Sequence, residues 1–97
     1  MVFDVFEISG IGEYERREEP KKERVLYLRG EKVFLVVNKN TIEVRCDSEL
    51  SKLLTEKYES VMVSRYFGRG GVEIVVAGKQ LNEGELEDLV RLSYNLS

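Results

Sequence analysis

The order of patterns from Thr41 to the C-terminus constrains the fold of this chain more than any other feature. Residues Thr41–Cys46 alternate between polar and apolar side chains, which predicts an antiparallel strand with one buried face. Asp47 is a suitable N-cap for a helix that follows directly. The apolar stripe of that helix is formed by Leu50, Leu53, Leu54 and Tyr58.

A hairpin is expected after this helix, because two β-rich runs flank a cluster of glycines. The runs are Ser60–Tyr66 and Val72–Ala77, and the glycine-rich tip between them is Phe67–Gly71. A glycine cluster of this kind is typical of a tight turn between antiparallel strands. Arg69 would then lie at the apex of the hairpin.

The last helix, expected over Glu83–Ser97, has the clearest start signal in the chain. Asn82 and Glu85 have the spacing of a capping box, and Leu81 can pack against Leu86 as a hydrophobic staple. The acidic residues of the first turn suit the positive end of the helix dipole. The residues expected to be buried along this helix are Leu86, Leu89, Val90 and Tyr94.

The first forty residues are less clearly patterned. A short helix, with a strand as the alternative, is expected over Val2–Ile8. Residues 13–24 carry balanced charges and Pro20, which favours a mobile charged connection. Arg24–Gly30 and Glu31–Val37 then predict two strands, and the second is apolar enough to be covered on both sides.

Length and composition limit the number of domains, the ligands and the location that can be expected for this protein. A chain of 97 residues has room for a single domain, and its net charge of -3 disfavours non-specific binding to nucleic acid. A single cysteine cannot form an intrachain disulfide, which favours a reducing compartment. The N-terminus does not resemble a signal peptide, and no stretch has the length of a membrane span. We therefore expect a cytoplasmic location and no membrane contact.

The sequence offers few residues for catalysis. With no histidine, the commonest general base is missing, and so are serine or cysteine triads that depend on it. Cys46 lies on the inward face of its strand, where a thiol is expected to be buried and inert. We therefore expect a protein that is not an enzyme and that has neither a cofactor nor a metal site.

The second hairpin carries the most suggestive surface residues. Arg65, Arg69 and Lys79 surround it, and Tyr66 and Phe67 lie between the first two. A basic hairpin with aromatic side chains can contact phosphates or enter a groove of nucleic acid. An ordinary surface turn would explain the same residues.

Four short motifs in a fixed order resemble the MmcQ/YjbR-like family over roughly residues 31–97. They are Glu49-Leu50-x-x-Leu53-Leu54, Ser64-Arg65-Tyr66, Leu81 through Glu85-Leu86, and Ser93-Tyr94. The chain departs from the family pattern at Ser48 and Asn82, where prolines are usual, and at Val72, where an aromatic residue is usual. The resemblance implies a two-layer α+β fold, related to secretion-chaperone and frataxin-like folds. Relatives are proposed to bind DNA through hairpin wings.

Two hypotheses of function follow from these observations. The first is a DNA-binding module that uses Arg65, Arg69 and Lys79. The second is a protein-interaction domain that uses an exposed sheet face around Thr41, Glu43 and Arg45, because an antiparallel sheet with helices on one side leaves its other side open. The expected order of elements is a short helix, three strands, a helix, two strands and a helix, in a single antiparallel sheet with the helices on one face.

Overall fold

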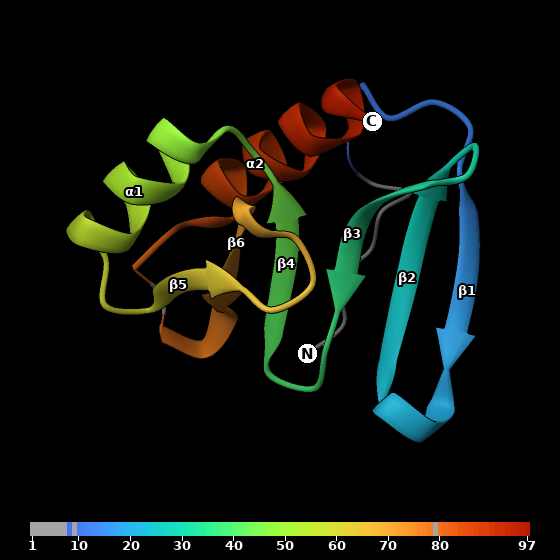
Figure 1. Cartoon of the computed structure of the whole chain (residues 1–97), viewed down its shortest axis with the longest axis horizontal. Helices are drawn as coiled ribbons and strands as arrows, with labels where there is room; N and C mark the ends of the chain where they lie inside the picture. Colours follow the sequence, from blue (N-terminus) through green and yellow to red (C-terminus); the bar gives the residue numbers. More distant parts are fainter. Residues whose placement is uncertain (1–7, 9, 79) are drawn as a thin grey trace.

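The computed structural model describes residues 8, 10–78 and 80–97. They form a six-stranded antiparallel sheet, in the order β1-β2-β3-β4-β6-β5, and two α-helices (Figure 1). The strands are β1 (Glu15–Glu19), β2 (Arg24–Arg29), β3 (Lys32–Val37), β4 (Thr41–Arg45), β5 (Val61–Ser64) and β6 (Gly68–Val75). The helices are α1 (Ser48–Lys57) and α2 (Glu83–Leu96), with short 3₁₀ turns η2 (Pro20–Lys22) and η3 (Val76–Gly78). The expected two-layer α+β fold with one antiparallel sheet is confirmed.

The N-terminal part of the chain differs from the expectation of a mobile connection. Glu15–Glu19 forms β1, which pairs with β2 along its whole length from Glu15 opposite Leu28 to Glu19 opposite Arg24. Pro20 starts the 3₁₀ turn that joins the two strands, where its missing amide hydrogen is not needed. The short helix expected over Val2–Ile8, with a strand as the alternative, lies outside the described residues except for Ile8. Ile8 is buried.

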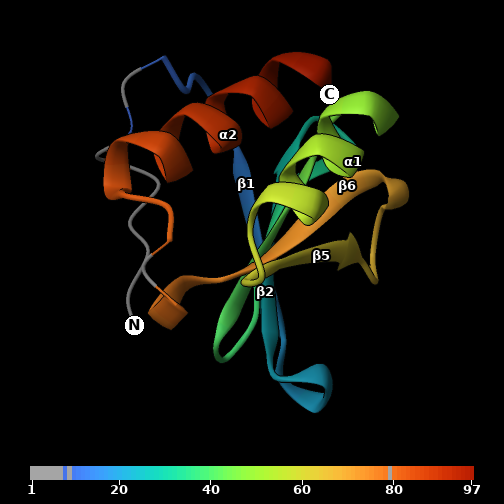
Figure 2. The same cartoon turned by 90° about the vertical axis from the view of Figure 1, so that its left-hand side faces the viewer.

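Both helices pack on the same face of the sheet, as the view along the sheet shows (Figure 2). The helix α2 lies mainly against β3 and β4, and α1 lies against β5 and β6. Apolar side chains that alternate along the central strands meet the helices there, so that burying them supplies most of the driving force for folding. The buried members from β4, β6 and α2 include Ile42, Val44, Val72, Ile74, Leu86 and Val90.

A β-bulge in β3 adds a large side chain to this core. Tyr27 pairs with Leu35 while Leu28 pairs with Val33, so that Phe34 is the extra residue. The ring of Phe34 is fully buried and meets the ring of Tyr94 edge to face, with the centroids 5.0 Å apart. The bulge therefore lets β3 contribute two consecutive large side chains to one core.

Ser93 of α2 satisfies the backbone groups that this bulge leaves without a strand partner. Its Oγ donates a hydrogen bond to the carbonyl of Phe34 and accepts one from the amide of Arg45 at 2.7 Å. A buried backbone group without a partner is costly, so this hydroxyl joins β3 to β4 where their direct pairing ends. Ser93 thus has a structural role in this fold.

Both predicted helix starts are confirmed, whereas one predicted core position is exposed and others are only partly buried. The carboxylate of Asp47 accepts from the amide of Leu50 at 2.8 Å, and Asn82 and Glu85 form the capping box. Leu53 points to solvent with 63% of its surface exposed, and the partly buried positions are Leu50, Leu54 and Leu89. The buried residue of α1 is Ser51, whose Oγ donates to the carbonyl of Gly71, so the face of α1 that packs on the sheet is rotated away from Leu53. Within the described residues, no helix is long and apolar enough to cross a membrane.

Candidate functional site

The turn between β5 and β6 folds back over the face of the sheet that the helices leave uncovered (Figure 1). The turn consists of Arg65–Phe67, whereas the glycines expected to form the tip begin β6. Arg69 is therefore a strand residue and does not lie at the apex. The change matters for function because the turn holds Arg65 against Glu73 of β6 and the Tyr66 backbone against Glu43 of β4.

Phe67 fixes the turn to the sheet. Its ring packs on a second apolar cluster, and the guanidinium of Arg45 lies 4.9 Å from the ring centroid. The cluster consists of Leu26, Leu28, Val33 and Val36. Gly71 makes this packing possible, because a Cβ there would lie 2.5 Å from the carbonyl oxygen of Val44 and 2.7 Å from the Cβ of Phe67. Gly71 thus serves close packing, not an unusual backbone angle.

Glu43 holds the same turn from below and is 1% exposed. One carboxylate oxygen accepts from the hydroxyl of Ser64 at 2.7 Å and from the amide of Tyr66 at 2.9 Å. The other accepts from the side-chain amide of Asn38 at 2.8 Å. A carboxylate can be buried when such donors replace its water shell, so the turn and Glu43 stabilise each other.

Glu73 is the direct cross-strand neighbour of Glu43 and is also buried. Arg65 donates to both of its oxygens, at 2.9 and 2.7 Å, and the hydroxyl of Thr41 donates at 2.8 Å. Burial alone would raise the pKa of Glu73, but the hydrogen bonds from Arg65 and Thr41 and the charge of Arg65 outweigh it and lower that pKa. Glu73 therefore stays ionised and keeps Arg65 over the sheet, although 75% of the Arg65 side chain is exposed.

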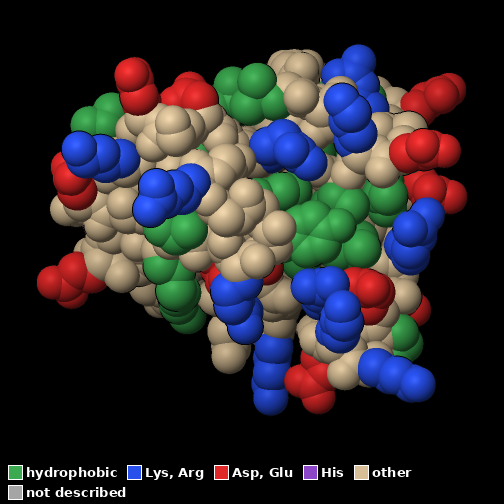
Figure 3. Space-filling view, viewed as in Figure 1, with side chains coloured by type: hydrophobic (Ala, Val, Ile, Leu, Met, Phe, Trp, Pro, Cys, Tyr) green, Lys and Arg blue, Asp and Glu red, His purple; other side chains and the backbone are tan. Residues whose placement is uncertain are grey.

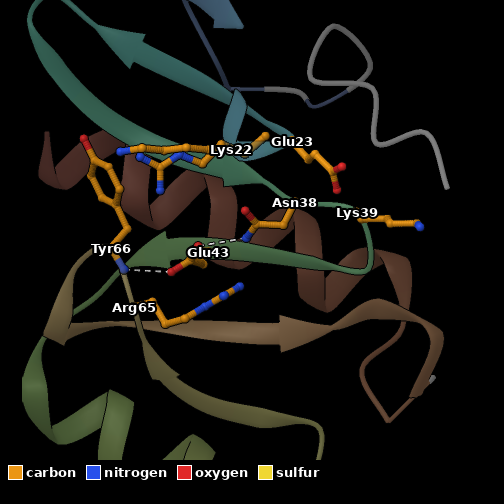
Figure 4. A pocket seen from close by; sticks show the side chains of 8 residues that line it. Lys22, Glu23, Asn38, Lys39, Glu43, Arg65 and Tyr66 are labelled. Carbon is orange, nitrogen blue, oxygen red and sulfur yellow. Dashed lines mark hydrogen bonds between the residues drawn. The ribbon is translucent and has the colours of Figure 1, made fainter. Parts of the chain in front are cut away.

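These contacts build one wall and the floor of a polar groove of about 590 Å³ (Figure 4). The first wall is the β5–β6 turn and the opposite wall is the end of η2 with the start of β2. Asn38 and Glu43 lie between the walls, and Lys39 lies at the β3–β4 end, with its amine directed outward in the figure. The groove is lined by Lys22, Glu23, Arg24, Asn38, Lys39, Glu43, Arg65 and Tyr66.

The cationic side chains of the groove differ in whether a carboxylate is already paired with them. Arg24 donates to Glu19 at 2.6 Å and stacks 5.2 Å from the Tyr66 ring centroid, and Arg65 is bonded to Glu73. Lys22 and Lys39 are exposed and form no ion pair with another described residue. The space-filling view shows several basic side chains gathered around the lower part of this face (Figure 3). Among the described residues, the positive charge of the groove that is not paired with a carboxylate therefore comes from these two lysines.

The structure brings together only part of the predicted nucleic-acid site. Arg65 lies in the groove, whereas Arg69 borders a separate depression beside α1, together with Ser48, Lys52 and Val63. Lys79 lies outside the described residues. Sequence reasoning missed Lys22, Arg24 and Lys39, because they belong to two turns and a strand start that come close to Arg65 only after the sheet has formed. The one available signal was that Lys39 lies between the predicted strands Glu31–Val37 and Thr41–Cys46, next to the strand of Glu43.

The alternative prediction was an exposed sheet face around Thr41, Glu43 and Arg45. The predicted exposure of this face is wrong. Glu43 is buried under the β5–β6 turn, and Thr41 is half-buried and bonded to Glu73. Arg45 is half-buried as well, with one guanidinium nitrogen donating to the carbonyl of Val33 at 3.3 Å. The physical reason is that the turn covers the face which the strand alternation alone leaves open.

Cys46 is buried in the main core, as the alternation in its strand predicts. Burial raises the pKa of its thiol to about 11, and the charge of Asp47 acts in the same direction. A thiol with so high a pKa is almost entirely protonated at neutral pH and is a poor nucleophile.

Compared with family models, curated proteins and solved structures, this chain matches none of them. The resemblance to the MmcQ/YjbR-like family therefore stays a prediction from the sequence.

Proposed function

We propose that this protein is a non-enzymatic binding module whose groove takes up nucleic acid, DNA in the first instance, through phosphate contacts. The observation that carries this proposal is the convergence of four cationic side chains from three separate chain segments on one groove. They are Lys22, Arg24, Lys39 and Arg65. Convergent cations focus a positive potential locally even in a protein of net charge -3.

The two lysines are suited to direct phosphate contact because they are exposed and their charges are not shared with a carboxylate of the described chain. Arg65 can contribute as well, since its guanidinium is mostly exposed while Glu73 fixes its direction. A positioned guanidinium loses little freedom on binding an anion, which favours affinity. Glu23 and Glu43 also line the groove, so binding is expected to be modest and sensitive to salt.

Tyr66 adds a surface on which an unpaired base can stack. Its ring is 39% exposed and borders the groove, with Arg24 on the ring and Phe67 against it edge to face at 5.0 Å. Such stacking is worth about 1–3 kcal/mol per base in proteins that bind single strands. The groove should therefore bind single strands at least as well as duplexes. The cytoplasmic location and the family assignment remain predictions that accompany this proposal.

Fluorescence anisotropy with a short labelled DNA duplex and the matching single strand tests the proposal. The double variant Lys22→Glu/Lys39→Glu should weaken binding of both probes. For the duplex, the slope of the logarithm of affinity against the logarithm of salt concentration should become shallower by about 1.8. Each lost phosphate contact removes about 0.9 from that slope. Tyr66→Leu should weaken binding of the single strand more than binding of the duplex.

The matched control is Lys32→Glu/Lys57→Glu, which makes the same change in net charge at exposed positions outside the groove. It should retain most of the affinity and the original salt slope. Arg69→Glu should also have a small effect, because Arg69 lies outside the groove. No binding by the wild type at low salt, or equal losses in groove and control variants, would contradict the proposal.

A further inference from the structure

The two edges of the sheet are protected very differently. At one edge, β1 exposes four charged side chains that pair on each face of the strand, Arg16 with Glu18 at 2.8 Å and Arg17 with Glu15 at 3.5 Å. At the other edge, β5 has the sequence Val-Met-Val-Ser with no charged residue. Charges on an edge strand prevent pairing with another strand, so β1 is guarded in a way that β5 is not.

The backbone of β5 has hydrogen-bonding groups available on its outer side. The amide of Val75 donates to the carbonyl of Ser60 at 2.8 Å, which makes Val61 and Ile74 a pair without direct hydrogen bonds. By the alternation of an antiparallel ladder, Met62 then bonds to β6, whereas the amide and carbonyl of Val63 and the carbonyl of Val61 point outward. In the described part of the chain, β6 is the one strand that pairs with β5.

Apolar side chains accompany these groups. Met62 is 43% exposed on the face that carries the groove, and Val63 is 50% exposed on the face that carries the helices. Beside Val63, a depression of about 390 Å³ separates it from polar and charged residues of α1, so that the helix does not close off this edge. The edge therefore offers both backbone groups and apolar surface to an incoming strand.

We propose that β5 pairs antiparallel with β5 of a second copy of this chain, around a two-fold axis at Met62. This register opposes Val61 of each copy to Val63 of the other, so that the outward carbonyls of Val61 meet the outward amides of Val63. The amide of Val61, which donates weakly to Tyr58 at 3.3 Å, can complete the ladder. A second copy supplies the same uncharged strand and the same outward groups.

The charges next to β5 favour a second copy over an unrelated strand. Glu59 precedes the strand and Arg65 follows it, and both are exposed. In a register centred on Met62, Glu59 of one copy comes to the same end of the paired strands as Arg65 of the other, since both are three residues from the axis, in the turns that flank β5. Arg65 is paired with Glu73, but 75% of its side chain is exposed, so opposite charges near both ends of the self-paired strand favour the association.

The pairing has a geometric consequence for the groove. A two-fold axis through a continuous antiparallel sheet is perpendicular to the sheet, so the two grooves would lie on the same face. The inference does not rest on the proposed nucleic-acid binding, because it depends only on the edge strand. If both hold, one strand of nucleic acid could contact two grooves, and the salt slope would grow accordingly.

The most specific test is the variant Met62→Cys under mild oxidation with oxidised glutathione. At a pair without direct hydrogen bonds, the two Cα atoms lie about 4.5 Å apart, within the range that a disulfide requires. Met62→Cys should thus form a covalent dimer on a non-reducing gel, whereas the matched variant Leu96→Cys, also at an exposed position, should not. The buried Cys46 should contribute no cross-link in the wild type. Absence of cross-linking by Met62→Cys in a folded sample would overturn the proposed register.

Sedimentation over a range of concentrations tests the association without a cross-link. The wild type should shift from monomer to dimer as concentration rises, and Val63→Lys should remain monomeric because it places two charges at the edge. Leu96→Lys introduces the same charge at a side chain that is likewise 50% exposed, and it should dimerise as the wild type does. A wild type that is monomeric up to millimolar concentration, or a Val63→Lys variant that dimerises normally, would overturn the inference.

Discussion

The two faces of the sheet are covered by different means. On one face, two helices bury an apolar core that includes Phe34, Val44 and Val90. On the other face, a three-residue turn covers a small apolar cluster and a polar network around Glu43 and Glu73. An antiparallel sheet with helices on one side thus need not leave its second side open, because the turn of its own hairpin can fold back over that side.

The two kinds of cover should respond differently to substitution. Truncation in an apolar core costs more stability the larger the cavity that remains, because neighbouring side chains fill only part of the space. A buried polar network loses stability when one partner is missing, because the remaining groups are left without water or hydrogen bonds. The helix face should therefore show large effects that do not depend on pH, and the turn face smaller effects that do.

The largest effect is expected on the helix face. Phe34→Ala removes a fully buried ring that contacts Tyr94, and it should lower the free energy of unfolding by about 3–5 kcal/mol. Urea denaturation followed by circular dichroism measures this change. A loss below about 1 kcal/mol would mean that the bulge does not place Phe34 in the core.

Glu73→Gln tests the pH dependence of the turn face. At neutral pH the variant should be less stable by about 1–3 kcal/mol, because a neutral amide cannot accept both hydrogen bonds from Arg65. The folded-state pKa of Glu73 lies below its ordinary value of 4.5, so its contribution is complete above pH 4.5 and is lost as the pH falls through the lower value. The difference between wild type and variant should thus shrink below pH 4.5, and a constant difference in denaturation series would contradict this account.

Gly71→Ala tests whether Phe67 is seated on the sheet. The added methyl group would overlap the carbonyl of Val44 and the side chain of Phe67, and it should cost about 1–3 kcal/mol. Gly70→Ala is the matched control, because its nearest contact would be the carbonyl of Phe67 at an ordinary 3.5 Å. Thermal unfolding of the two variants should separate them, and equal stabilities would argue that the turn is not packed.

The smallest effect is expected at Leu53, although the sequence predicts it to be buried. Leu53→Ser should change the free energy of unfolding by no more than about 0.5 kcal/mol, because the side chain faces solvent. Leu86→Ala, at a buried position of α2, should cost about 2–5 kcal/mol in the same chemical denaturation. Comparable losses in both variants would place Leu53 in the core after all.

The sequence predicted the helix face well because its signals are local. Asn82 and Glu85 define the start of α2 within four residues, and the alternation in Thr41–Cys46 identifies Val44 as a core residue. The strand β1 was missed because all of its residues, Glu-Arg-Arg-Glu-Glu, are charged and give no apolar period. Its stability comes from pairing with β2, which composition does not reveal.

The turn face could not be predicted because its partners are distant in the chain. The alternation places Glu43 outward correctly, but its burial depends on Ser64 and Tyr66, more than twenty residues further on. The groove likewise requires Lys22 and Arg65 to meet across four strands. Arg65 was identified from the sequence, whereas its neighbours in the groove are determined by the folded sheet.

Amide hydrogen exchange of Tyr66 and Phe67, followed by NMR, tests most directly whether the turn covers the second face. The amide of Tyr66 donates to the carboxylate of Glu43 and that of Phe67 donates to the hydroxyl of Ser64. A hydrogen bond to a charged group is worth about 1.5–3 kcal/mol, so the Tyr66 amide should exchange roughly 10–100-fold more slowly than in an unstructured chain. Protection of both amides, lost at Tyr66 in Glu43→Ala, is the predicted result. Exchange of both amides at the unprotected rate in the wild type would show a free hairpin tip and contradict the account.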